Sequence, residues 1–155
     1  MRRARFKPLD DAALVTMSER MRPIDRLEAR ALSGGVPLLE QLRAVARQTK
    51  RGTACYVDGE LVCIFGRIDG TLLTAECFPW MVATDALERP GVTRLFVRLG
   101  SRRLLQLLRG MRKGSNMVYE GNARTIRWLR FVGFRFSGEP VMVGGLKFLP
   151  FSMEL

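Results

Sequence analysis

The sequence lacks histidine entirely and has only three cysteines, Cys55, Cys63 and Cys77. Without histidine the chain cannot form a Ser-His or Cys-His nucleophile pair, and it lacks the commonest metal ligand. The cysteines are odd in number and show no Cys-x-x-Cys spacing, which argues against a zinc site or a disulfide framework. We therefore expect no metal site and no hydrolase of these types.

Long apolar runs are also missing. No stretch approaches the roughly 18 residues that a membrane span needs. The basic start, Met1 to Lys7, leads into Pro8-Leu9-Asp10-Asp11 rather than into an apolar signal segment. The sequence thus predicts no membrane span and a protein that stays in the cytoplasm of the cell that makes it.

Acidic residues are the minority charge: 26 Lys and Arg face 15 Asp and Glu, a net charge of +11. Such a surplus attracts polyanions at low salt. A solvated basic face and a surface that contacts DNA both explain it. With 155 residues, 47% of them apolar, the chain suits one domain over residues 1–155 that buries its own core.

Periodicity and turn residues predict an alternation of strands and helices. An edge strand is expected at Ala4 to Lys7, limited by Pro8, and a strand at Ser115 to Glu120. A terminal hairpin is expected to run from Phe134 to Val143 and from Leu146 to Met153, with Gly144-Gly145 between its strands. The helices are expected at Asp10 to Met21, Pro23 to Ala31, Pro37 to Lys50 and Val92 to Met111.

Two Asp-Gly pairs predict a three-stranded antiparallel meander. Asp58-Gly59 would join 53–57 to 60–65, and Asp69-Gly70 would join 61–68 to Thr71 to Phe78, each as a two-residue turn. With a two-residue loop at Asp58-Gly59, Cys55 faces Val62, so Cys55 and Cys63 should point to opposite faces of the sheet. Pro79 would then interrupt the third strand, as a bulge or as its end.

The stretch from Gly121 to Phe134 carries both ends of a helix. Asn122 can cap its start by accepting hydrogen bonds from free N–H groups, and Gly133 can close it in a left-handed conformation. Ile126, Leu129 and Val132 share one face of this helix. The rest of the helix surface has two interpretations. Either it is a contact surface made by Arg124, Arg127, Trp128 and Phe131, or Trp128 and Phe131 pack under the terminal hairpin.

The spacing of Asn122, Thr125, Gly133 and Phe134 resembles the last conserved helix of the GNAT superfamily of acetyl-CoA-dependent N-acyltransferases. The Gly-Asn start and the Ile-Arg-aromatic-Leu centre are most similar to GNAT-like internal virion, or head-core assembly, proteins of short-tailed phages. The resemblance implies an α/β (α+β) GNAT-like fold: a central, mostly antiparallel mixed sheet of about six or seven strands with helices on both faces. In that fold the strand that contains Pro79 splays from the next one and opens a slot for the pantetheine arm of the cofactor.

The resemblance also implies site residues. Leu129 stands where most active members carry the Tyr that protonates the leaving thiolate. The family's pyrophosphate turn, Gln/Arg-x-x-Gly-x-Gly/Ala at a helix start, has its nearest match at 97–102, which makes Gly100, Ser101 and Arg102 candidate acetyl-CoA contacts together with Asn122. The candidates for acid-base chemistry are Glu76, near the place of a general base in some members, and Tyr119, as a substitute acid.

These residues favour a phage-encoded GNAT-fold protein with degenerate acetyl-CoA and catalytic motifs, acting in virion structure or head and internal-core assembly. Its partners would be other virion proteins, and it would be found in the host cytoplasm and the virion. The alternative is an active acetyl-CoA-dependent N-acetyltransferase, because positioning of the reactants alone supplies much of the acceleration. A second alternative is a basic nucleic-acid-binding protein.

Overall fold

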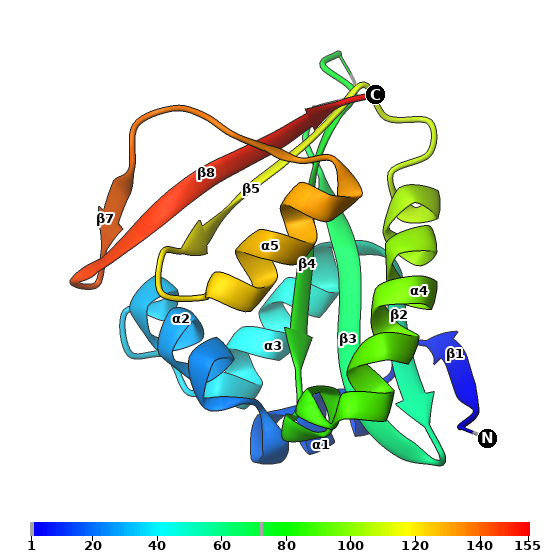
Figure 1. Cartoon of the computed structure of the whole chain (residues 1–155). Coiled ribbons are helices and arrows are strands. Elements are labelled where there is room, and N and C mark those ends of the chain that lie inside the picture. Colours follow the sequence, from blue (N-terminus) through cyan, green and yellow to red (C-terminus); the bar gives the residue numbers. More distant parts are fainter. Residues whose placement is uncertain (1, 72) are drawn as a thin grey trace.

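The computed structural model describes residues 2–71 and 73–155 (Figure 1). Strands and helices alternate as the periodicity predicts. In chain order they are β1 (Ala4–Pro8), α1 (Asp11–Arg20), α2 (Pro23–Ser33), α3 (Leu38–Gln48), β2 (Thr49–Val57), β3 (Glu60–Asp69), β4 (Glu76–Ala83), the 3-10 helix η1 (Asp85–Glu88), α4 (Pro90–Leu107), β5 (Lys113–Tyr119), α5 (Ala123–Val132), β6 (Arg135–Phe136), β7 (Val141–Val143) and β8 (Leu146–Glu154).

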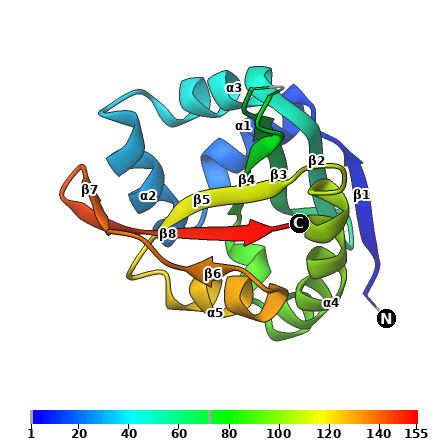
Figure 2. The ribbon, with the colours of Figure 1, turned by 90° about the horizontal axis from the view of Figure 1, so that it is seen from above.

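The strands form one mixed sheet in the order β1-β2-β3-β4-β5-β8-β6, with β7 paired to β8. Only β4 and β5 are parallel among these pairs. The sheet has eight strands, more than the six or seven expected, because the terminal hairpin includes the short strands β6 and β7. Figure 2 shows α1 and α3 on one side of the sheet and α4 and α5 on the other. The predicted fold class is confirmed.

Each face of the sheet has its own apolar core. Ala13, Leu14 and Met17 of α1 pack with Leu42 of α3 on the face that carries Ile64. On the other face, side chains of α4 and α5 pack against the strands; this second core includes Val92, Leu104, Leu107, Ile126, Leu129, Cys63, Phe65, Val118 and Phe151. The central strands are therefore covered above and below, as their apolar residues on both faces require.

Several helix ends follow from single residues. Asp10 caps α1 by accepting from the Ala13 N–H at 2.9 Å. Pro23 begins α2 at a position where its missing N–H costs nothing, and Gly34 ends that helix with φ 65°. In the part of the chain that the structure describes, no helix is long and apolar enough to cross a membrane.

The first Asp-Gly turn is confirmed, but the strand register beyond it is not the expected one. Asp58 and Gly59 have φ of 51° and 81°, the positive values of a two-residue hairpin turn. A register shift between Cys55 and Tyr56 then places Cys55 opposite Cys63 instead of Val62. Residues directly opposite in an antiparallel pair share a face, so the expectation that these two cysteines point to opposite faces is wrong. Both thiols are free and buried.

The second Asp-Gly pair does not form a two-residue turn. Asp69 ends β3, and β4 begins only at Glu76, whose carbonyl accepts from the Gly70 N–H at 2.9 Å. The strand predicted from Thr71 to Phe78 therefore starts five residues later, and Leu72 within that prediction lies outside the described residues. The three-stranded antiparallel meander of β2, β3 and β4 is nevertheless present.

Candidate functional site

The two parallel strands β4 and β5 separate soon after they meet. They pair only at Glu76 with Lys113 and at Cys77 with Gly114. Beyond that point β4 stays with β3 and β5 stays with β8, so a gap opens between them (Figure 1). Pro79 lies where the gap begins, and its carbonyl accepts from Asn116 Nδ2 at 2.9 Å. The pairing of β4 with β3 runs through Pro79 without a register shift, so the predictions of a strand end or a bulge there are both wrong.

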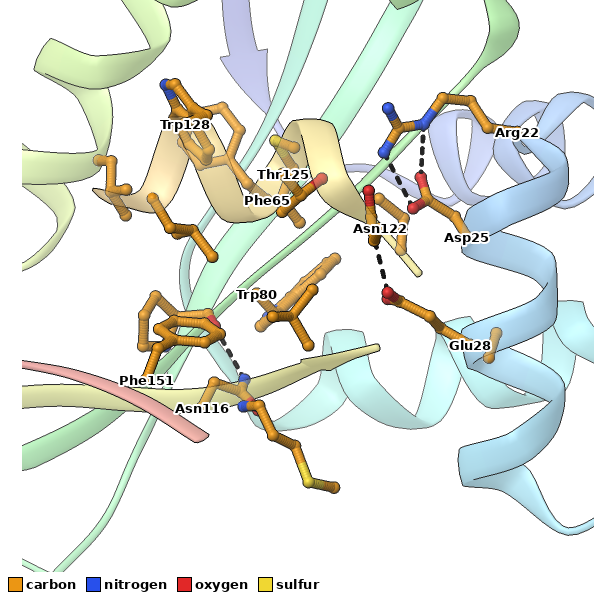
Figure 3. Close-up of a pocket in the computed structure, with 18 of the residues that line it drawn as sticks. Arg22, Asp25, Glu28, Phe65, Trp80, Asn116, Asn122, Thr125, Trp128 and Phe151 are labelled. Atoms are coloured by element: carbon orange, nitrogen blue, oxygen red, sulfur yellow. Dashed lines mark hydrogen bonds and ion pairs between the residues drawn. The ribbon is translucent and has the colours of Figure 1, made fainter. Parts of the chain in front are cut away.

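A cavity of about 220 Å³ fills this gap. Residues of β4 and β5 form its walls, and side chains from helices on both faces of the sheet close it (Figure 3). The α4 and α5 side includes Phe96, Gly100, Trp128 and Leu129, and the α2 and α3 side includes Glu28, Ala29, Leu32, Leu42 and Val45. The cavity therefore passes through the sheet between its two split strands.

Helix α2 brings a buried ion pair to the cavity wall. Arg22 Nε and Nη2 donate to Asp25 Oδ2 and Oδ1 at 3.0 and 2.9 Å, and both side chains are buried. Asp25 Oδ2 also accepts from the Ala83 N–H at 2.8 Å, while the Ala83 carbonyl accepts from the Arg22 N–H at 2.8 Å. Burial raises the pKa of Asp25, and Arg22 and the Ala83 amide oppose that rise. The start of α2 is thus fastened to the end of β4.

Glu28, one turn further along α2, differs from Asp25 because no Lys or Arg among the described residues forms an ion pair with it. Its Oε1 accepts from the Tyr119 N–H at 3.2 Å and from Asn122 Nδ2 at 3.1 Å. Every buried side-chain oxygen in the described residues has a hydrogen-bond partner, so Glu28 Oε2, which has none, is not fully buried, and Glu28 is one of the residues that line the cavity. Burial raises the pKa of Glu28 to about 7, despite the hydrogen bond from Asn122 that lowers it. Near neutral pH this carboxylate can take up or release a proton.

Asn122 lies next to α5 as expected, but its side chain does not cap that helix. Its amide turns towards Glu28 and is buried (Figure 3). The predicted cap is wrong because the buried carboxylate requires a donor more than the helix start does. Gly133 does end the helix, with φ 123°.

The residues predicted to contact the cofactor's pyrophosphate do not lie at the start of a helix. Gly100, Ser101 and Arg102 are in the middle of α4, where backbone N–H groups are already bonded within the helix, so the expected turn at 97–102 is wrong. Gly100 lines the cavity, and a Cβ there would come within 2.7 Å of the Phe96 ring. Ser101 Oγ accepts from Trp128 Nε1 at 3.0 Å, and Arg102 is exposed.

The first turn of α4 contains a different glycine, Gly91, directly after Pro90. A Cβ on Gly91 would lie 2.7 Å from Arg2 Nε, so the glycine leaves room for the Arg2 side chain beside the first turn of α4, whose first N–H groups have no partner within the helix. Aligned with the pyrophosphate turn that the resemblance implies, Gly91 would take the fourth place, with Glu88 instead of the leading Gln or Arg and Thr93 instead of the final small residue. Pro90 signals this helix start in the sequence, because Pro favours the first helical position.

The acid-base candidates from the sequence are not at the cavity. Glu76 lies at the start of β4, beside Lys113 and before the strands separate. Tyr119 does not line the cavity either; its ring lies 6.4 Å from that of Phe148. Leu129 does line the cavity and is buried. The position at which the resemblance expects the family's Tyr therefore lines the cavity and carries no hydroxyl.

The two large aromatics of α5 have separate environments. Trp128 packs on Phe96 of α4, with ring centroids 5.1 Å apart, rather than under the terminal hairpin. Phe131 is 72% exposed, so packing under the hairpin is wrong for it too. Together with the exposed Arg124 and Arg127, Phe131 remains a predicted contact surface.

Comparison with known proteins gives a match in structure alone. No family model matches the sequence, and no curated protein does. A spermidine N-acetyltransferase of Vibrio cholerae, solved with CoA and spermine, superposes with a TM-score of 0.69 at 11% identity over 97% of this chain and 95% of that one. A ribosomal-protein-alanine N-acetyltransferase of Brucella melitensis gives 0.69 at 15% identity, over 97% and 99% of the two chains.

A putative acetyltransferase of Salmonella typhimurium, solved with acetyl-CoA, gives a TM-score of 0.67 at 17% identity over 97% of this chain and 93% of that chain. The class that these observations define is an α+β domain whose mixed sheet splits at its parallel pair. More narrowly, it is the fold of the GNAT acetyltransferases, as the sequence resemblance implied.

Proposed function

We propose that the chain transfers an acyl group from a coenzyme A thioester to an amine. The open carboxylate of Glu28 carries this proposal, because it stands in a cavity that helices from both faces of the sheet line. Such a cavity can hold a donor and an acceptor side by side next to one base, and bringing two reactants together supplies much of the catalysis in acyl transfer. The structural neighbours solved with CoA or acetyl-CoA support the proposal.

Two places in the structure fit coenzyme A. Ala83 turns its N–H and carbonyl away from β3, so Met81, two residues earlier, presents its own N–H and carbonyl to the same gap. The backbone N–H and carbonyl of Ala83 already bond to Asp25 and Arg22. The backbone groups of Met81 are therefore the ones on this edge of β4 that can bond to a pantetheine arm. At the start of α4, the free N–H groups around Gly91 and the guanidinium of Arg2 suit a pyrophosphate. Bound acetyl-CoA would supply the acyl group as a reactive thioester.

Glu28 supplies the base. An aliphatic ammonium has a pKa near 10 and must lose a proton before its nitrogen can attack. Glu28 Oε2 can accept that proton, because the pKa of about 7 leaves a large share of the carboxyl ionised at neutral pH. The Tyr119 N–H and Asn122 hold Oε1, which fixes the direction of the other oxygen.

Leu129 limits the rate of such a reaction. A positioned general acid contributes about 10² to 10⁴-fold, and the leucine cannot donate a proton to a leaving thiolate. We therefore expect a slow enzyme in which positioning and the base provide the acceleration.

A thermal-unfolding titration with acetyl-CoA at fixed salt tests this function, with ADP as the control for charge. A ligand at about 100 times its dissociation constant stabilises the native state by about 2.7 kcal/mol, which raises the melting temperature by several degrees. A shift with acetyl-CoA that ADP does not reproduce is the expected result. Equal shifts from both would show attraction to polyanions alone and overturn the proposal.

The second candidate is a structural role in a phage virion, close to the head-core assembly proteins that the sequence resembles. Leu129 at the position of the acid, together with Glu88 and Thr93 in the pyrophosphate pattern, favours this reading. A scaffold of this kind should show no acetyl-CoA-specific stabilisation, so the same titration distinguishes the two candidates.

A further inference from the structure

On the side of the cavity that α2 and α3 form, apolar side chains lie beside the polar lining residues Arg22, Asp25, Glu28 and Gln41. Ala29 and Leu32 of α2 and Leu42 and Val45 of α3 line it. Trp80 of β4 continues this lining, and its Nε1 is turned away to donate to Thr49 Oγ1 at 3.1 Å. Leu32 is 47% exposed, so the apolar lining reaches the molecular surface at this side chain. An acceptor entering here would contact aliphatic and aromatic side chains.

Polar side chains on this side are mostly engaged with the protein. Gln41 Nε2 donates to the Ala29 carbonyl at 3.1 Å, and Asn116 Nδ2 donates to Pro79. A ligand that carried several polar groups would find few partners for them, and unpaired polar groups in such a place oppose binding.

Three ionisable side chains line the cavity, and two of them neutralise each other. Arg22 and Asp25 form their bidentate pair, with the Ala83 N–H as a further donor to the carboxylate. Of these three side chains, Glu28 is the one that is not paired with an opposite charge, and its Oε1 accepts from the Tyr119 N–H and Asn122 Nδ2 while its Oε2 makes no hydrogen bond. The lining thus presents one anionic oxygen and can match one positive charge.

We propose that the acceptor is a primary amine with a single positive charge on an apolar body, held by Glu28 Oε2 at the ammonium and by the α2–α3 lining along the body. This deepens the proposed function and rests on it. A polyamine fits poorly, because its second ammonium would lie among Leu42, Val45 and Trp80 without a counter-charge.

Calorimetric titration without any acyl donor tests the inference, with 2-phenylethylamine, 2-phenylethanol and spermine as probes at about pH 8, above the pKa of about 7 for Glu28. The amine should bind more tightly than spermine. Glu28→Gln should weaken binding of the amine at least about tenfold, the loss expected for one charge-assisted hydrogen bond. The same variant should weaken binding of the uncharged alcohol much less than binding of the amine, which would show that the apolar lining is intact.

Val45→Asp provides a gain of function in the same assay. It adds a second acid to the apolar lining from α3 and should shift the preference towards spermine. The inference is overturned if spermine binds wild-type protein as tightly as the monoamine, or if Glu28→Gln leaves binding of the amine unchanged. Because no acyl donor is present in this titration, its outcome does not depend on the proposed acyl transfer. A protein that binds the amine as expected but releases no thiol from acetyl-CoA would contradict the proposed function and leave the inferred amine site in place.

Discussion

Asn122 Nδ2 donates a hydrogen bond of 3.1 Å to Glu28 Oε1, although 94 residues separate the two in the sequence. The bond joins α2 on one side of the split sheet to the residue that precedes α5 on the other. It also explains why Asn122 leaves its helix uncapped, since a buried carboxylate without donors costs more than a missing cap. The helix thus loses a stabilising cap, and the hydrogen bond gained in its place holds the Glu28 carboxyl, whose pKa is raised, at the cavity.

Replacing Glu28 by Gln should change how stability depends on pH. Burial raises the pKa of this carboxyl from 4.5 to about 7, so between these values the folded protein binds more protons than the unfolded chain, and stability falls as pH rises. The shift corresponds to roughly 3 kcal/mol at about 1.4 kcal/mol per pKa unit. Glu28→Gln keeps an oxygen that can accept from the Tyr119 N–H and Asn122. In this variant the fall in the free energy of unfolding between about pH 4 and pH 8 that Glu28 causes should disappear.

Urea unfolding at both pH values measures the effect. The matched control is Glu40→Gln, because Glu40 is exposed on α3 and should leave the wild-type pH dependence in place. Parallel pH profiles for wild type and Glu28→Gln would show that the Glu28 pKa is not raised.

Replacing Asp25 by Asn should destabilise the fold strongly. The change leaves Arg22 as a buried charge without its counter-ion, and breaking a buried pair in this way typically costs about 3–5 kcal/mol. Asp11, which makes the same two-bond contact with Arg43 on the surface, provides the control. Asp11→Asn should cost far less, because water solvates both partners there. Equal losses in denaturant unfolding would mean that the buried pair does not anchor α2.

Valine at Gly91 and at Gly100 should separate cofactor binding from packing. Gly91→Val places a side chain against Arg2 and the first-turn N–H groups, so we expect at least about tenfold weaker acetyl-CoA binding. Its effect on stability should be small, because Gly91 is exposed and Arg2 can move. Gly100→Val instead forces a Cβ towards the Phe96 ring and should destabilise the protein by about 1–3 kcal/mol. Unchanged acetyl-CoA affinity in Gly91→Val would remove Gly91 from the cofactor site.

Tyrosine at position 129 should increase the rate of acyl transfer. The side chain lines the cavity, so a hydroxyl there could protonate a leaving thiolate, an effect of about 10²-fold or more. Leu129→Phe adds the same ring without the hydroxyl and controls for packing. The comparison is made on steady-state thiol release. If both variants turn over at the same rate, a missing acid does not limit this protein.

Much of the fold follows from local sequence signals. Asp10, Pro23 and Gly34 mark helix ends, and Asp58-Gly59 marks a hairpin, because each supplies a conformation or a hydrogen bond that the backbone needs at that point. The sequence does not reveal the register shift at Cys55, since the apolar residues on both faces of β2 and β3 favour no single register.

The candidate site is harder to predict from the sequence because its residues come together only in the tertiary structure. Glu28 belongs to a helix with many charged residues and would be taken for a surface side chain; only the separation of β4 from β5 and the approach of Asn122 bury it. Gly91 could have been recognised, since Pro90 before it marks a helix start. The prediction instead placed the turn at Gly100, whose neighbours fit the family pattern no better.

The most direct test of the account is thiol release from acetyl-CoA with 2-phenylethylamine as acceptor, measured between about pH 5 and pH 9 in wild type and in Glu28→Gln. We predict amine-dependent release that rises with an apparent pKa near 7, the value for Glu28, and that Glu28→Gln loses about 10²-fold or more. Release that does not depend on the amine, or that is equal in wild type and Glu28→Gln, would contradict the assignment of this cavity as an acyl-transfer site.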